Sequence, residues 1–163
     1  MNNDADIRRV LVEHPKLYIA LRHDYITLFR FQDLSRSTIE LYVDYLRQMG
    51  PRIRPDARNL FDLRFAGMPS MYLLEMADRL YEGIPIPPTV KNALLISTVS
   101  IYSTMMRILL RRLTSVGESR VFIHETEAIA WLKENLPPSD YGGTQSLCPH
   151  HLHCCWRALL FRG

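Results

Sequence analysis

The chain has 163 residues, of which 47% are hydrophobic and 23% charged, which is enough for one domain with a sizeable core. Its 20 basic residues outnumber its 17 acidic ones and are spread along the whole chain, whereas nucleic-acid binding usually leaves a basic stripe or patch. No apolar run is long enough to cross a bilayer, and the first residues do not form a secretory signal. We therefore expect a cytoplasmic protein with no nucleic-acid partner and no transmembrane segment.

The first fifteen residues predict a packed arm or a short helix ahead of the main domain. Within residues 5–13, Ile7, Val10 and Leu11 are spaced as on one face of a helix, and Pro15 ends the pattern. We assign residues 1–15 to this N-terminal arm.

Two β-rich runs follow, residues 16–22 and 25–31. The two residues between them indicate an antiparallel hairpin whose turn lacks the usual glycine. A helix then begins at Ser37-Thr38-Ile39-Glu40, a capping box in which the serine hydroxyl and the glutamate carboxylate bind free amides of the first turn. Apolar side chains at helical spacing continue to Leu46, and Gly50-Pro51 ends the helix.

The central stretch, residues 58–80, reads as a strand, a short turn and a helix. Alternation of apolar with other residues predicts a strand with one row on the core, formed by Phe61, Leu63 and Phe65. After the turn the apolar spacing becomes helical up to Leu80, and Pro69 fits the first helical turn because its missing N–H costs nothing there.

The second half alternates further strands with helices. A continuous apolar run at residues 93–96 is typical of an interior strand covered on both faces. Residues 102–113 carry the cleanest helical stripe, residues 121–123 predict a last strand, and Thr126 caps a helix that buries Trp131. This order predicts an α/β sandwich with four helices and a mixed five-stranded sheet, which opens with the hairpin and continues in parallel.

Composition changes at Pro137, so we expect the main domain to cover residues 16–136 and an irregular tail to cover residues 137–163. The tail holds all three cysteines and three of the six histidines. Thiolates and imidazoles are zinc ligands. However, Cys-x-x-Cys pairs are missing, and the adjacent Cys154 and Cys155 do not easily bind one tetrahedral ion. We predict no metal site and no cofactor.

Asp62, Ser97 and His124 are the candidate reactive residues. Nothing links them at motif spacing, since the chain has no Gly-x-Ser-x-Gly elbow, no phosphate-binding glycine loop and no His-Glu-x-x-His. A response-regulator receiver would use Asp62 and a hydroxyl after the next strand, yet the acidic pair that holds magnesium is absent. We expect Asp62 to pair with Arg64 or Arg58 or to face solvent, and we predict that the chain is not an enzyme.

Three stretches carry a family likeness: the hairpin and helix at residues 18–49, the strand at 60–64, and the closing strand and helix at 121–132, which end in Ala-x-x-Trp-Leu. Together they resemble the STAS domains, the family of anti-sigma factor antagonists and sulphate-transporter tails, and within it the SpoIIAA-like proteins. The resemblance covers residues 16–136. It implies the STAS sandwich fold and a regulatory role through a protein partner, either a kinase or another regulator.

In the switching members of this family, a partner kinase phosphorylates a serine or threonine at the start of the helix after the central strand. The resemblance therefore implies Ser70 as the phosphoacceptor, although Pro69 stands where those members have an acidic residue. A phosphate there would face the free amides of a helix start, and its charge would disrupt an apolar docking surface nearby.

The same turn is the predicted interaction surface, formed by Gly67, Met68, Ser70 and Met71. Loops at the carboxyl ends of parallel strands face ligands, and methionine suits adaptable apolar contacts. The alternative is that both methionines only cover the core. A domain of this kind docks on a regulator or kinase, binds a small lipid-like ligand, or forms a homodimer, and the charge pattern selects none of these. We predict a non-enzymatic protein-interaction module, with binding of a small apolar ligand as the alternative function.

Overall fold

The computed structural model describes residues 6–76, 79–97 and 117–135. Within them lies one six-stranded sheet whose spatial order follows the chain. The strands are β1 (Ile7–His14), β2 (Leu17–Arg22), β3 (Ile26–Phe31), β4 (Arg58–Asp62), β5 (Lys91–Leu95) and β6 (Glu118–Phe122). The first three strands pair antiparallel, and β3 to β6 pair in parallel. The α/β class and the mixed sheet are confirmed.

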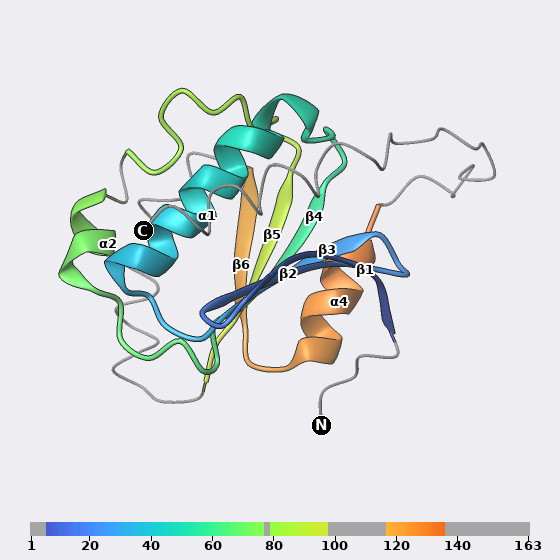
Figure 1. Ribbon diagram of the computed structural model, residues 1–163. Helices are drawn as coiled ribbons and strands as arrows, with labels where there is room; N and C mark the ends of the chain where they lie inside the picture. The colour runs from blue at the N-terminus through green and yellow to red at the C-terminus, as the bar shows by residue number, and fades with distance from the viewer. Residues whose placement is uncertain (1–5, 77–78, 98–116, 136–163) are drawn as a thin grey trace.

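Helices cover both faces of the sheet (Figure 1). On one face lie α1 (Arg36–Met49), continued by the short 3-10 helix η2 (Gly50–Arg52), and α2 (Met71–Met76). Helix α1 connects β3 to β4, and α2 connects β4 to β5, so each crossover moves one strand along the sheet in the same direction. Right-handed crossovers of this kind place their helices on the same face. The other face carries α4 (Glu125–Lys133). None of the described helices is long and apolar enough to cross a membrane.

Two hydrophobic cores result, one on each face of the sheet. The larger packs α1 and α2 on the sheet, and it centres on aromatic rings that stack or meet edge to face. The smaller lies beneath α4, where Trp131 and Leu132 pack on Leu60 and Leu95. Side chains of β4 and β5 therefore lie in a core on each face of the sheet. For β5 this agrees with the prediction of an interior strand at residues 93–96.

The sheet has six strands and not the predicted five, because the segment expected as a helix or arm is strand β1. It pairs with β2 through register shifts between Ile7 and Arg9 and between Val10 and Val12. These bulges insert extra residues, so the apolar side chains lose the period of two that marks a strand. The spacing of Ile7, Val10 and Leu11 therefore resembles that of a helix. Backbone pairing with β2 nevertheless makes the segment a strand.

The structure has three α-helices in its described residues, whereas the sequence predicts four; the predicted helix at residues 102–113 lies outside the described part. The starts of the others also shift. Helix α1 begins at Arg36, with Ser35 as N-cap, so the capping box at Ser37 is wrong. Helix α4 has His124, not Thr126, as its N-cap. Helix α2 is described over Met71–Met76, and residues 79–83 form turns, so the helix does not reach the predicted end at Leu80.

The β2–β3 hairpin is confirmed, and its turn shows how the chain manages without glycine. The Tyr25 amide donates to the Arg22 carbonyl oxygen at 3.1 Å, and Tyr25 itself has a φ of 62°. A three-residue loop needs a left-handed residue at this position, and that residue is usually glycine. Here the ring lies under the Arg8 guanidinium, 5.0 Å from the ring centroid, which offsets part of the strain.

Candidate functional site

The connection from β4 to α2 and the first residue of α2, Met71, together hold every residue of the predicted interaction surface. Gly67 turns the chain with a φ of 66°, a left-handed conformation that favours glycine. Pro69 is buried and precedes the helix by two residues, so it does not occupy the first helical turn as expected. The amide of Leu73 donates to Ser70 Oγ at 3.2 Å, so the half-buried Ser70 caps α2.

Three apolar side chains face outward here, two in the connection and one at the start of α2. Phe65 is 65% exposed, Met68 is 53% exposed and Met71 is 69% exposed. The methionines therefore do not cover the core. Phe65 was expected in the buried row of the central strand, but β4 ends at Asp62, and the alternation does not continue past it. We call Phe65, Met68 and Met71 the apolar patch.

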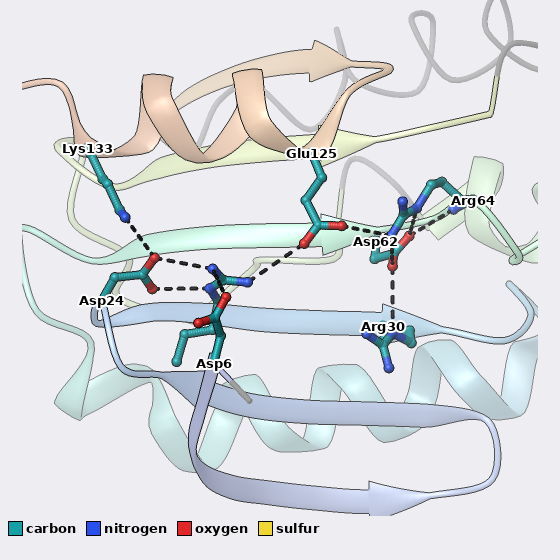
Figure 2. Close-up of polar contacts among 8 residues, drawn as sticks. Asp6, Asp24, Arg30, Asp62, Arg64, Glu125 and Lys133 are labelled. Atoms are coloured by element: carbon teal, nitrogen blue, oxygen red, sulfur yellow. Dashed lines mark hydrogen bonds and ion pairs between the residues drawn. The ribbon is translucent and has the colours of Figure 1, made fainter. Parts of the chain in front are cut away.

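An ionic network lies on the face of the sheet that carries α4 (Figure 2). One of its members, Arg64, directly precedes Phe65 of the patch. Its most buried member is Asp62, which is only 1% exposed. Arg64 binds both carboxylate oxygens of Asp62, at 2.9 and 2.8 Å, and Arg30 lies 3.6 Å away. The Asp62 hydrogen bond is the main reason why the pKa of Arg64 is raised. Pairing of Asp62 with Arg64 is confirmed, whereas Arg58 binds the Leu132 carbonyl oxygen.

From Arg64, the network continues to both ends of α4. Glu125, at the start of α4, accepts from Arg64 at 3.1 Å and lies 3.7 Å from Arg22. Arg22 is 6% exposed and binds Asp24, which also pairs with Lys133 at 3.0 Å. Burial tends to raise the pKa of Asp24, but the hydrogen bonds from Arg22 and Lys133 outweigh it and lower the pKa.

The eight charged groups of the network balance. Four carboxylates face four cations, and the members are Asp6, Asp24, Asp62, Glu125, Arg22, Arg30, Arg64 and Lys133. A balanced network of this kind joins elements together and leaves little field for a charged ligand.

The candidate reactive residues do not form a site. Asp62 is enclosed by arginines, Ser97 is half-buried after β5, and His124 is exposed at the N-cap of α4. Among the described residues, no hydrogen bond or ion pair joins Asp62 to either of the others. Within the residues that the structure describes, no three histidine, cysteine, aspartate or glutamate side chains are grouped so that they could hold a metal ion. The cysteines and histidines of residues 137–163 lie outside it.

Comparison with known proteins adds no assignment: no family model, no curated protein and no solved structure matches this chain.

Proposed function

We propose that this protein is a non-enzymatic regulatory module of the STAS type, which binds a protein partner through the turn formed by Gly67, Met68, Ser70 and Met71. The observation that supports the proposal is the exposure of Met68 and Met71 at 53% and 69%. Exposed large apolar side chains gathered in one turn are typical of protein-interaction sites, because covering them removes apolar surface from water.

The surroundings of the turn favour a protein over a polyanion as partner. Arg64, the network cation next to the patch, is already bound to Asp62 and Glu125. The patch therefore offers apolar contact area and flexible methionines, which adapt to the shape of a partner surface. A nucleic acid would need several cations that are not already paired.

Phosphorylation of Ser70 is the second part of the proposal. Ser70 lies between Met68 and Met71 in the chain, and its hydroxyl oxygen accepts a hydrogen bond from the Leu73 amide. A phosphate on this oxygen would place about two negative charges within the apolar patch. Desolvating those charges opposes docking, so phosphorylation would release the partner.

The double variant Met68→Glu with Ser70→Glu tests this surface. Met68 is exposed, so a charge there stays in water, and residue 70 directly precedes α2, where the helix dipole favours a negative charge. Circular dichroism and the thermal midpoint should therefore show a folded protein. A partner captured from native cell extract should bind the variant at least about tenfold more weakly in a titration, because two charges replace apolar contacts. The control is Val10→Glu, which adds a charge at an exposed apolar position on β1 that lies outside the turn. Equal affinity of the double variant and the control would place the partner surface elsewhere.

A further inference from the structure

The apolar patch borders a carboxylate that has no partner in the described part of the chain. Glu75 is the charged residue of α2, and it is exposed. Residues four apart in a helix lie on the same face, so Glu75 stands beside Met71 of the patch. Within the described residues, the Glu75 carboxylate makes no hydrogen bond or ion pair. The surface therefore combines exposed apolar side chains with a negative charge that nothing balances.

One segment of this chain has the complementary composition. Residues 156–162 read Trp-Arg-Ala-Leu-Leu-Phe-Arg, so large apolar side chains alternate with two arginines. After Asp140, Arg157 and Arg162 are the only charged residues of the sequence apart from histidines. A basic, apolar segment matches an apolar surface that carries an unpaired carboxylate.

The chain between α4 and this segment is long enough to reach the patch. The end of α4 lies beside the start of β5, because Lys91 Nζ donates to the Glu134 carbonyl oxygen at 3.3 Å. The patch begins beyond the opposite end of β4. A strand of this length spans about 17 Å, whereas residues 136–155 can span up to about 66 Å. A segment tethered in this way has an effective concentration on the order of millimolar, so even a weak contact holds it in place.

We propose that residues 156–162 of this chain cover the apolar patch, with Arg157 and Arg162 next to Glu75. The contact removes the patch from water and gives the carboxylate a cation. The inference goes beyond the proposed function, because it concerns the chain without any partner. One consequence rests on that function: a partner that binds the same turn must first displace the segment, so the segment lowers the affinity for the partner.

Oxidation of methionines by hydrogen peroxide tests the contact in the purified full chain. Oxidation follows exposure, and peptide mass spectrometry measures each methionine separately. The variant Leu160→Glu places a charge in the apolar contact, so Met68 and Met71 should oxidise at least about threefold faster than in the natural chain. The matched control Leu152→Glu adds the same charge outside the segment and should leave both rates unchanged. Met49, which packs against the larger core, should oxidise equally in all three chains.

Charge reversal tests the part played by Glu75. Glu75→Arg should raise both oxidation rates, and the further changes Arg157→Glu and Arg162→Glu should lower them again, because the charges then attract once more. A local disturbance of α2 by Glu75→Arg would not be reversed by changes in residues 156–162.

Two results would overturn the inference. One is equal oxidation of Met68 and Met71 in the natural chain, in Leu160→Glu and in Leu152→Glu. The other is protection that grows with the concentration of the natural chain, because the segment would then cover a second copy. None of these measurements uses the partner, so the proposed function would stand if they failed, and its own test remains the loss of partner binding in the variant with Met68→Glu and Ser70→Glu.

Discussion

Three glycines of the described residues have left-handed conformations, and two of these positions, Gly67 and Gly117, need glycine for different reasons. Gly67 and Gly117 have φ values of 66° and 76°. An added Cβ at Gly67 would meet nothing within 4 Å, whereas at Gly117 it would lie 2.3 Å from the Val90 carbonyl oxygen. That oxygen accepts a hydrogen bond from the Glu118 amide, with 2.9 Å between nitrogen and oxygen. This bond is where the pairing of β6 with β5 begins. Gly117 is therefore required by a close approach of two backbones, and Gly67 only by its conformation.

Alanine at the two positions should separate these costs. Gly67→Ala carries only the left-handed strain and should cost about 1–2 kcal/mol in the free energy of unfolding. Gly117→Ala adds a clash with fixed backbone and should cost about 3 kcal/mol or more. Urea denaturation of both variants measures the difference. Equal losses would mean that β6 and the residues before β5 separate easily.

Helix α1 is started by a side chain from outside it. Asp33 accepts hydrogen bonds from the Ser35 amide at 2.9 Å, from the Ser35 hydroxyl at 2.6 Å and from the Thr38 hydroxyl. Burial tends to raise the pKa of Asp33, but these hydrogen bonds and the nearby Lys16 outweigh it and lower the pKa to about 2. The carboxylate thus replaces the predicted capping box, and it ties the β3–α1 connection to the buried Thr38.

The lowered pKa of Asp33 predicts how the stability depends on pH. The folded pKa lies below the ordinary value of 3.8, so the stabilisation is fully present above about pH 4 and is lost as the pH falls toward 2. The variant Asp33→Asn lacks this contribution at all pH values. Its thermal midpoint should lie below that of the natural chain at pH 6, and the two should converge between pH 4 and 2. A gap that persists at pH 2 would show that the ionised carboxylate is not the stabilising form.

The ionic network joins elements that lie far apart in the chain. Asp62 belongs to β4 and pairs with Arg30 of β3. Arg64 pairs with Asp62 and also with Glu125 of α4. Arg22 then connects Glu125 to the turn after β2 (Figure 2). The position of α4 on the sheet is thus fixed by ion pairs at both ends and by Trp131 and Leu132 in between.

Removing the charge of Asp62 should affect the whole molecule. Asp62→Asn leaves two arginines without their buried carboxylate, and breaking a buried pair in this way costs about 3 kcal/mol or more. The matched control is Asp44→Asn, since the Asp44 side chain is 61% exposed in its pair with Arg47 and should contribute less than about 0.5 kcal/mol. Urea unfolding of both variants checks this prediction. A loss below 1 kcal/mol for Asp62→Asn would mean that the arginines find other partners.

Local patterns in the sequence were sufficient for the elements that follow a regular period. The hairpin, the interior strand at residues 93–96 and the parallel order of β3 to β6 are confirmed. The burial of Trp131 on α4 is confirmed as well. These features depend on side chain periodicity and on connection length, which neighbouring residues determine by themselves. The turn at residues 67–70 is located by its glycine, proline and serine for the same reason.

Other features were decided only by the tertiary structure. Strand β1 exists because β2 offers it an edge, and its bulges hide the period of a strand. Phe65 and Ile123 are exposed because they lie beyond the ends of β4 and β6, and a strand's last paired residue depends on its neighbour in the sheet. The ionic network brings together residues from Asp6 to Lys133. Sequence separation of that size gives no periodic signal, so only the packed sheet shows which charges meet.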